Sequence, residues 1–404
     1  MARVRSIPSM GEDNVGKDSA AIKQGLGLLF DDSGRAGFRE DFERNRPGIY
    51  EGSPACLELI SWRDLDHLFA FSPTYHGIEF LPKSGGGLGD DPAFPHPLAL
   101  TDCYRIFSEG YSLLFPQMEK RWRAISLFCG ELTRCLGFVV ECDLLASMPC
   151  AAAFTRRSGE LACFALQLSG ASGWAVRADD SGKADPWPDG RISLTRGQLH
   201  YVPPGHHCEI EPSGEGSLFL WLRMKLTTWK NLLLAAVEHA ADQLPAMRQG
   251  FILDDPNDDR ALDRLVAELK TRLPAVFDHL DAGLGKKDLL AELIEAMTPV
   301  PSGHFEQIEW LGSLGPDTPV EHRAGVLGTV ILTGDKVEFP FPGNELDGPD
   351  KMFLALEFIL ETPRFTPRQI PGWYSEEEQC TIVRSLIYRG YLRFADPAAA
   401  GAST

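Results

Sequence analysis

The spacing of hydrophobic positions changes several times along the 404-residue chain. Within residues 49–71 the segment SWRDLDHLFA predicts a helix that has Ser61 as its N-cap and Asp64 three residues later. Residues 83–97 are dense in Gly and Pro, which predicts a loop. Apolar residues at helical spacing in residues 116–136 predict an amphipathic helix. Two helices are therefore expected in this part of the chain.

Between residues 137 and 224 the hydrophobic pattern becomes that of β-strands. Short apolar runs alternate with turn sequences such as DDSGKADPWPDGR and PSGEG. The clearest predicted strands are residues 160–168, 173–176, 200–203 and 217–224. Short strands at this spacing are typical of a double-sheet jelly roll.

After residue 225 the pattern is mainly helical. Leu262, Leu265, Val266, Leu269 and Leu273 form a stripe at helical spacing, which follows the Asp-rich sequence DDPNDDR. Such helices either complete the fold or form a dimer interface, and the sequence supports both interpretations.

The last hundred residues predict a separate unit. Two short apolar runs flank a Gly-Asp turn, which predicts a β-hairpin. The expected elements are strands at 329–332, 336–341 and 391–394 and helices at 351–360, 366–370 and 375–389. Three helices followed by a strand is the order of a winged helix. A capping box of Ser375 and Glu378 starts the last helix, and Gly390 ends it.

The helix that would enter a DNA groove begins with Glu376, Glu377 and Glu378. Carboxylates repel phosphate groups, and the whole chain carries a formal charge of −18. Both observations argue against a nucleic-acid partner, so the C-terminal unit is expected to be an interaction or structural module.

The apolar runs and the cysteines of the chain indicate the cellular compartment in which the protein is expected. No apolar run is long enough to cross a bilayer, and no apolar core follows the basic residues at the N-terminus, so a cytoplasmic protein without a membrane partner is expected. The nine cysteines are scattered without a CxxC pair, which is typical of reduced, buried thiols.

Two segments carry a family resemblance: AFTRRSGELACFALQLSGASGW and, about thirty residues later, GQLHYVPPGHHCEIE. They resemble the JmjC/cupin iron and 2-oxoglutarate oxygenases and, more narrowly, the ribosomal-oxygenase branch; FALQLSG and YVPPG are the most specific pieces. The resemblance implies an α+β fold in which a double-stranded β-helix (jelly-roll/cupin) barrel precedes a helical dimerisation domain and a C-terminal winged helix. The predicted division is a polar, loosely ordered segment at 1–45, a jelly-roll domain at 46–225, a helical dimerisation domain at 226–300, a winged-helix domain at 301–396 and a tail at 397–404.

The family holds iron with an HxD pair before the FxLQL strand and a His three residues after the PxG loop. By this resemblance the metal-ligand positions fall on Arg157, Gly159 and Cys208, and the co-substrate lysine position falls on Ser172. A guanidinium cannot donate an electron pair to iron, and glycine offers no ligand. Iron and 2-oxoglutarate are therefore disfavoured, and no cofactor is expected.

A shifted ligand set is an alternative. His206 and His207 are next to Cys208, so either could replace one ligand. Nothing replaces the first pair, because no histidine occurs between His96 and His200.

Strand alternation places Arg157 on the same side as Gly159, Cys163, Ala165 and Gln167, and the resemblance makes that side the barrel interior. A buried guanidinium requires an anionic or carbonyl partner, and Arg157 is expected to pair with a protein carboxylate or with an acidic group of a ligand. The candidate pocket comprises Arg157, Cys163, Gln167, His206, His207 and Cys208.

Cys163 and Cys208 allow three interpretations. They are packing thiols, or part of a soft-metal site with His206 or His207, or one of them is a reactive thiol whose pKa is lowered by Arg157.

The sequence supports two hypotheses about function. The first is a non-catalytic homologue that binds a peptide or protein, or acts as a scaffold, and forms a homodimer through residues 226–300. The second is a repurposed or atypical oxygenase that modifies a peptide or protein side chain. The motifs alone leave open whether the protein is an enzyme.

Overall fold

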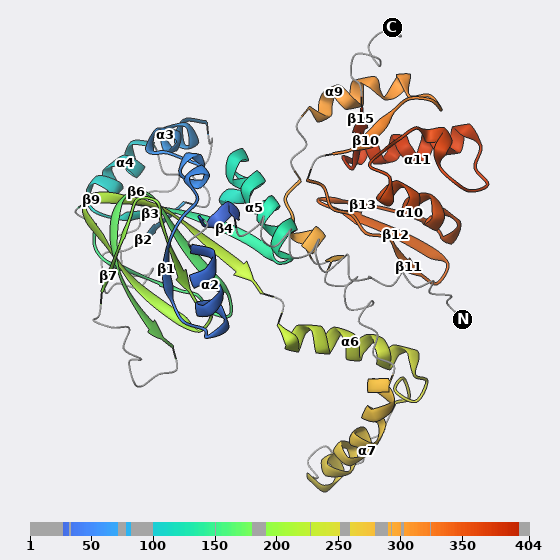
Figure 1. Cartoon of the computed structure of the whole chain (residues 1–404), viewed down its shortest axis with the longest axis horizontal. Coiled ribbons are helices and arrows are strands. Elements are labelled where there is room, and N and C mark those ends of the chain that lie inside the picture. Colours follow the sequence, from blue (N-terminus) through green and yellow to red (C-terminus); the bar gives the residue numbers. More distant parts are fainter. Residues whose placement is uncertain are drawn as a thin grey trace. The chain divides into compact units, whose positions relative to one another are not determined.

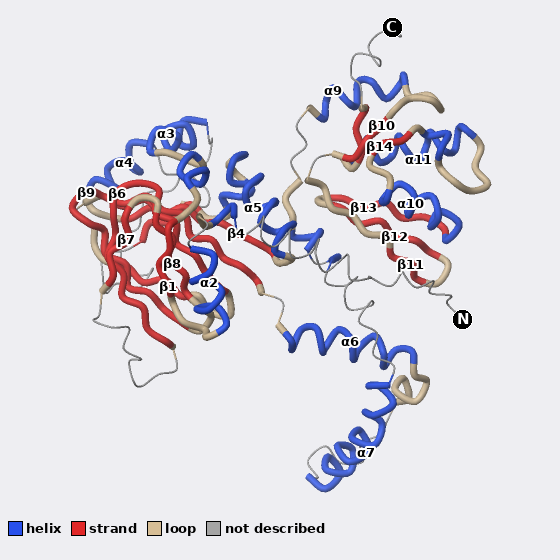
Figure 2. Tube along the Cα trace, viewed as in Figure 1, coloured by secondary structure: helices blue, strands red, loops and turns tan. Residues whose placement is uncertain are grey.

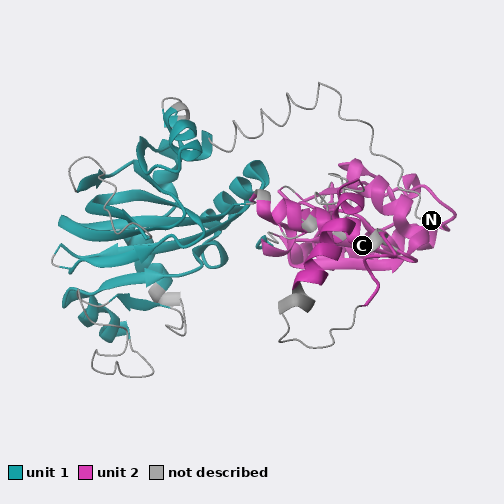
Figure 3. Cartoon of the chain, turned by 90° about the horizontal axis from the view of Figure 1, so that it is seen from below, with its two compact units in different colours: residues 1–226, 297–300 teal, residues 227–296, 301–404 magenta. Residues whose placement is uncertain are grey.

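The structure is a computed structural model. It describes residues 27–31, 34–71, 78–81, 100–149, 151–179, 191–226, 228–250, 259–278, 290–291, 293–299, 303–323 and 325–395. The chain divides into two compact units, Met1–Leu226 with Met297–Val300 and Thr227–Ala296 with Pro301–Thr404 (Figure 3).

The first unit combines helices with one extensively paired β-sheet (Figure 1). Its elements are α2 (Gly34–Glu43), β1 (Gly48–Glu51), η1 (Pro54–Glu58), α3 (Trp62–Phe71), β2 (Glu79–Leu81), α4 (Leu100–Ser108), β3 (Ser112–Phe115), η2 (Met118–Lys120), α5 (Arg123–Leu136), β4 (Val139–Ser147), β5 (Phe154–Arg157), β6 (Ala162–Ala178), β7 (Ile192–Thr195), β8 (Gln198–Val202) and β9 (His206–Lys225). Here η denotes a 3-10 helix.

Two long strands, β6 and β9, pair with each other along most of their length and build two layers (Figure 2). The first half of β6 and the second half of β9 lie in one layer, which β8, β1, β4, β3 and β2 extend in the order β1-β8-β6-β9-β4-β3-β2. The second half of β6 and the first half of β9 lie in the other layer, where β7 pairs with β6 and β5 with β9. Two layers of antiparallel strands joined in this way form a jelly-roll barrel.

The strands change layer where their pairing is irregular. The register between β6 and β9 shifts between Gln167 and Ser169 and again between Gly170 and Ser172. Gly170 has φ +65, and a Cβ atom built on it would lie 2.0 Å from the carbonyl oxygen of Gly216. Glycine is therefore required at this bend of the FALQLSG segment.

Alternation along the strands creates two hydrophobic cores. One face of the larger layer packs against the helices and the N-terminal residues, with Phe164 and Tyr201 in this outer core. The opposite face points between the layers, where Trp174, Phe219 and Trp221 belong to the inner core of the barrel.

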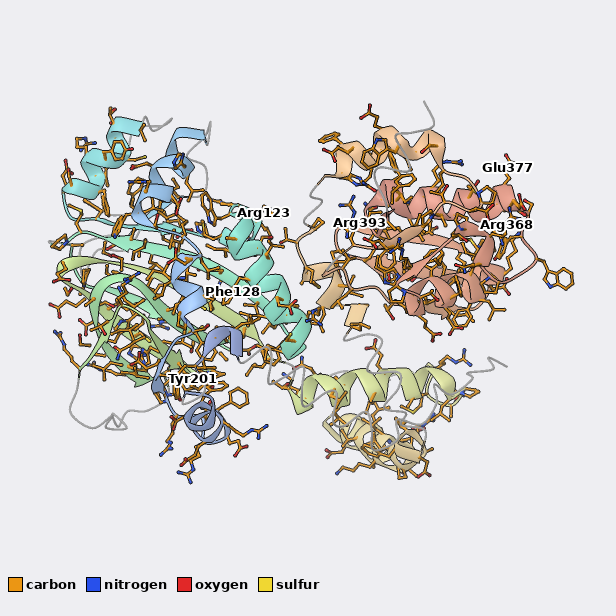
Figure 4. The ribbon with its side chains drawn as sticks, turned by 45° about the horizontal axis from the view of Figure 1, so that its top comes forward. Arg123, Phe128, Tyr201, Arg368, Glu377 and Arg393 are labelled. Carbon is orange, nitrogen blue, oxygen red and sulfur yellow. The ribbon has the colours of Figure 1, made fainter. Side chains whose placement is uncertain are left out.

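The structure corrects the expectation that residues 1–45 are loosely ordered throughout. Residues 34–43 form α2, and Phe38 packs with its ring centroid 5.3 Å from those of Phe164 and Tyr201. Tyr201 lies beside α2 (Figure 4). Residues 1–26 and the predicted loop at 83–97 lie outside the described residues.

Of the two helices predicted in this part of the chain, one begins where expected and the other begins later. The helix predicted within residues 49–71 is α3, whose cap is confirmed because the backbone N–H of Ser61 donates to Asp64 at 2.8 Å, while residue 49 lies in β1. The helix predicted at 116–136 is confirmed from residue 123 onward as α5, and η2 precedes it.

The second unit contains helices and two three-stranded sheets, β14-β10-β15 and β11-β12-β13 (Figure 1). Its elements are α6 (Trp229–Gln243), α7 (Asp259–Asp278), α9 (His304–Glu309), η3 (Trp310–Ser313), β10 (Val320–His322), β11 (Ile331–Thr333), β12 (Lys336–Phe341), β13 (Asn344–Pro349), η4 (Asp350–Met352), α10 (Phe353–Glu361), β14 (Arg364–Phe365), η5 (Pro367–Gln369), α11 (Glu376–Arg389) and β15 (Leu392–Phe394).

The predicted hairpin and capping box of this unit are confirmed. Thr333 pairs with Lys336 across the two-residue turn, and the backbone N–H of Glu378 donates to Ser375 at 3.3 Å. The helix predicted at 366–370 is the single 3-10 turn η5. Of the helices that the structure describes, none combines the length and the hydrophobicity that crossing a bilayer requires.

Candidate functional site

The strand β5 places Arg156, and not Arg157, on the inner side of the barrel. Arg156 is directly opposite Cys208 in β9, whose side chain is fully buried, whereas Arg157 is opposite His207 and is exposed. Facing residues of paired strands project to the same side. The expectation that Arg157 lies in the interior is therefore wrong by one residue.

The reason is the turn that separates β5 from β6. Gly159 lies in this turn with φ +59, and its carbonyl oxygen accepts a hydrogen bond from the backbone N–H of Gly205 at 2.7 Å. The alternation of β6 therefore does not continue into β5. Gly159 itself is a turn residue and not part of a strand face.

Arg156 binds a buried carboxylate. Its Nη2 atom donates to Oδ2 of Asp143 at 2.7 Å, and Nη2 of Arg223 donates to Oδ1 of the same residue at 3.3 Å. The side chain of Asp143 is 3% exposed, whereas those of Arg156 and Arg223 are 19% and 28% exposed. We call Asp143, Arg156 and Arg223 the arginine cluster. The pair with a carboxylate that was expected of Arg157 is made by the neighbouring Arg156 instead.

Strand pairing brings the arginine cluster to the thiols of the predicted pocket. Cys163 is opposite Arg223, and Cys208 is opposite Arg156. Both thiols are fully buried, and burial raises the pKa of Cys163 to about 12, although Arg223 and Arg156 lower it in part. Burial also raises the pKa of Cys208 well above its usual range, with a smaller contribution from Cys163. Burial therefore disfavours the thiolate forms, which argues against the reactive-thiol interpretation.

His206 and His207 form hydrogen bonds with groups other than the Cys208 thiol. The Nδ1 atom of His206 lies 3.0 Å from the carbonyl oxygen of Pro204, and that of His207 lies 2.9 Å from Oδ1 of Asp179. His207 faces Arg157 and so lies on the opposite side of β9 from Cys208. Within the described ranges, no three His, Cys, Asp or Glu residues gather in a group that could hold a metal ion.

The predicted co-substrate position is part of a closed hydrogen-bond network. Ser172 donates to Oε1 of Gln167 at 2.8 Å and accepts from Nε1 of Trp174 at 2.8 Å. The amide nitrogen of Gln167 donates to the hydroxyl of Ser217 at 2.9 Å and to the carbonyl oxygen of Ser169 at 2.7 Å. We call Gln167, Ser172, Trp174 and Ser217 the glutamine cluster. All four side chains are buried, and their polar atoms satisfy one another.

Aromatic rings fill the interior beside the glutamine cluster. Trp174 stacks on Trp221 with centroids 5.9 Å apart and an angle of 9° between the ring planes. Phe219 and His200 contact the edges or faces of Trp174, each at a centroid distance of 5.3 Å. Burial lowers the pKa of His200 to about 3, so the imidazole is neutral at ordinary pH. The inner core is therefore a packed, aromatic environment.

These residues do not fit the iron site of the resembled family. Arg157 is exposed, Gly159 is a turn glycine, and Cys208 faces the Arg156 guanidinium, which cannot donate an electron pair to a metal. A cation placed there would also be repelled by Arg156 and Arg223.

The sequence analysis did not single out the three residues of the arginine cluster, Asp143, Arg156 and Arg223. Asp143 and Arg223 are charged residues of opposite sign inside the apolar segments VVECDLLAS and LFLWLRMK. A charged residue in a buried strand requires a partner, so this pattern could have indicated the ion pair.

The strand order, the two layers and the helical cover define an α+β protein with a jelly-roll barrel of the cupin kind. No protein-family model matches the chain. Comparison with curated protein sequences gives no match.

Among solved structures, the chain is similar to the ribosomal oxygenase YcfD of Escherichia coli. One structure gives a TM-score of 0.49 at 16% sequence identity and covers 88% of this chain and 97% of YcfD. A structure of YcfD in complex with cobalt and 2-oxoglutarate gives a TM-score of 0.48 at 15% identity, with coverages of 91% and 99%. The cupin domain of Drosophila melanogaster CENP-C is similar over 20% of this chain and 55% of that domain, with a TM-score of 0.18 at 13% identity.

Proposed function

We propose that this chain is a non-catalytic, cytoplasmic homologue of the JmjC/cupin oxygenases that binds a peptide or protein. The observation that carries the proposal is the arginine cluster. Next to Cys208, one of the three positions that the resemblance assigns to metal ligands, two guanidiniums flank the carboxylate of Asp143, and Arg156 faces Cys208 directly. Such a group binds anions and repels metal cations, so the site suits recognition without iron or 2-oxoglutarate.

The glutamine cluster supports the same proposal. The position that would anchor 2-oxoglutarate is Ser172, whose hydroxyl both donates and accepts within the cluster. The Trp174–Trp221 stack fills the adjacent interior. A small co-substrate would have to displace these contacts, and breaking them would leave buried polar atoms without partners.

The second unit supplies candidate surfaces for assembly. We propose that α6 and α7 form a homodimer interface, because both helices expose large apolar side chains that a partner would cover. These side chains are Leu233, Leu234, Val266, Leu269 and Phe277, each between 46% and 57% exposed.

We propose that the C-terminal part is a winged helix that serves as an interaction module and not as a DNA-binding domain. The first turn of α11 contains three glutamates, and the neighbouring Arg368 is already paired with Asp317 and Glu376. Arg368 and Glu377 lie at the same end of this part (Figure 4). The acidic start of α11 disfavours a phosphate backbone.

The proposal is tested by metal analysis and by turnover. Protein purified without a tag and without chelator is expected to contain no stoichiometric iron, copper or zinc. It is also expected to consume 2-oxoglutarate no faster than background when iron, ascorbate and candidate peptides are supplied. One equivalent of bound metal, or turnover that His207→Ala abolishes, would show that the alternative, an atypical oxygenase, is correct.

A further inference from the structure

The arginine cluster contains more hydrogen-bond donors than acceptors. The Asp143 carboxylate already accepts three hydrogen bonds, one from each arginine and a third from the backbone N–H of Gln117 at 3.2 Å. The second acidic side chain, that of Glu141, lies 3.0 Å from Nη2 of Arg223 and is 43% exposed. Solvent screens the charge of Glu141, so one buried carboxylate faces two guanidiniums.

Three N–H donors on this inner side have no acceptor among the residues that the structure describes. They are Nε of Arg156, Nε of Arg223 and the indole Nε1 of Trp221, and all three atoms are buried. Strand pairing groups them, because Trp221 is opposite Asp143 and lies two residues before Arg223. Buried donors without partners are rare in native proteins, and a cluster of them indicates an acceptor that is supplied from outside the chain.

The two guanidiniums are also accessible to such an acceptor. Their side chains are 19% and 28% exposed, and both residues are near strand ends, Arg156 in β5 and Arg223 two residues before the end of β9, which places them at the mouth of the barrel. A guanidinium offers five donors in a planar fork, of which Arg156 and Arg223 each use only Nη2 in this cluster. This geometry matches the two oxygens of a carboxylate.

We propose that the mouth of the barrel binds a carboxylate of the peptide or protein ligand through Arg156 and Arg223. This inference rests on the proposed function and adds the chemistry that the ligand must present. The carboxylate belongs either to an acidic side chain or to a C-terminus, since both present the same two oxygens. Asp143 holds the two arginines in place and competes with the ligand for their donors.

The test is a titration followed by the side-chain ¹⁵Nε–¹Hε resonances of arginine, with chelator present and 2-oxoglutarate absent. Three probes separate the sources: N-acetyl-glutamate amide carries only the side-chain carboxylate, N-acetyl-glutamine only the terminal one, and N-acetyl-glutamine amide neither. Saturable shifts of the Arg156 and Arg223 resonances are expected with one or both carboxylates and not with the neutral probe. Arg156→Lys and Arg223→Lys assign the resonances and are expected to weaken binding at least about tenfold.

Two variants control the outcome. Arg157→Lys changes the adjacent exposed arginine and is expected to leave the titration unchanged. Asp143→Asn removes the competing charge and is expected to tighten carboxylate binding about tenfold. The inference is overturned if neither wild type nor Asp143→Asn shows a carboxylate-dependent shift, or if the neutral probe shifts the resonances equally. Because no metal takes part, this failure is distinct from the discovery of bound iron or of turnover.

Discussion

The arginine cluster, at the mouth of the barrel, and the glutamine cluster, in its interior, differ in how their hydrogen bonds are completed. In the glutamine cluster, Ser172 joins Gln167 to Trp174, and the amide of Gln167 reaches Ser217. In the arginine cluster, one buried carboxylate serves two guanidiniums and a backbone amide, while both Nε atoms lack an acceptor among the described residues. A closed set of polar groups stabilises a fold, whereas a set with surplus donors can also recognise a ligand.

The largest expected effect is that of Asp143→Ala. It leaves two arginines on the inner side of the barrel without their shared anion, so we expect the free energy of unfolding to fall by about 3–5 kcal/mol. Urea denaturation measures this loss, and Asp143→Asn, which keeps one acceptor oxygen, should lose less. A loss below about 1 kcal/mol would show that water already solvates both guanidiniums and that the cluster is not a buried site.

The second prediction concerns how the free energy of unfolding depends on pH through His200, whose ring borders the glutamine cluster. Burial lowers the pKa of His200 to about 3, whereas an unfolded histidine titrates near about 6.5. The unfolded state therefore binds the proton first, so stability is fully present above about pH 6.5 and falls as the pH drops toward 3. The slope approaches about 1.4 kcal/mol per pH unit below pH 6.

His200→Gln removes this titration, and comparison of its unfolding free energy with that of wild type between pH 4 and 7 isolates the contribution of His200. Parallel pH profiles of the two proteins would mean that the folded barrel admits a protonated imidazole. In that case the interior beside the glutamine cluster would be less closed than the packing indicates.

The third prediction tests the closure of the glutamine cluster. Ser172→Ala removes the acceptor of the Trp174 indole N–H and the donor to Gln167, so we expect a loss of about 2 kcal/mol in the free energy of unfolding. Carboxylate binding at the arginine cluster should stay unchanged. Ser193→Ala, at an exposed serine of β7, is the matched control and should cost less than about 0.5 kcal/mol. Equal effects of the two changes would argue that water replaces the lost hydroxyl.

The smallest expected effect is that of Arg157→Gln, because this side chain is exposed. We expect a change below about 0.5 kcal/mol, whereas Arg156→Gln should exceed it by more than about 1 kcal/mol. Thermal or urea unfolding of both variants in parallel gives the comparison. If Arg157→Gln is the more damaging change, the side assigned to β5 is reversed.

The position of several strands could be predicted from the sequence, but the direction of one critical side chain could not. Apolar runs and turns located β8 and parts of β6 and β9, but β6 was predicted as two strands and the first half of β9 was missed. Counting backward from β6 failed at Arg157, because the turn at Gly159 starts a new strand with its own alternation. The pairing of Arg156 with Cys208 is long-range information that no local pattern contains.

Other differences have equally local causes. The sequence predicts two strands of the C-terminal hairpin but not β13, whose segment NELDGP has only one buried residue, Leu346. The helix α2 was missed because its composition is polar. It is held against the sheet by aromatic contacts of Phe38 with Phe164 and of Phe42 with Tyr201. Tertiary packing overrides composition in both segments.

The passage of β6 and β9 through both layers has a consequence for how the barrel opens. Because β6 and β9 each continue from one layer into the other, neither layer can detach while the other stays paired. Backbone amides on both sides of the Gly170 bend should therefore exchange with solvent deuterium in a single cooperative event, at close to the free energy of global unfolding. An extended ligand would then find a rigid rim instead of a hinged cleft, and its own chain would have to adapt its conformation.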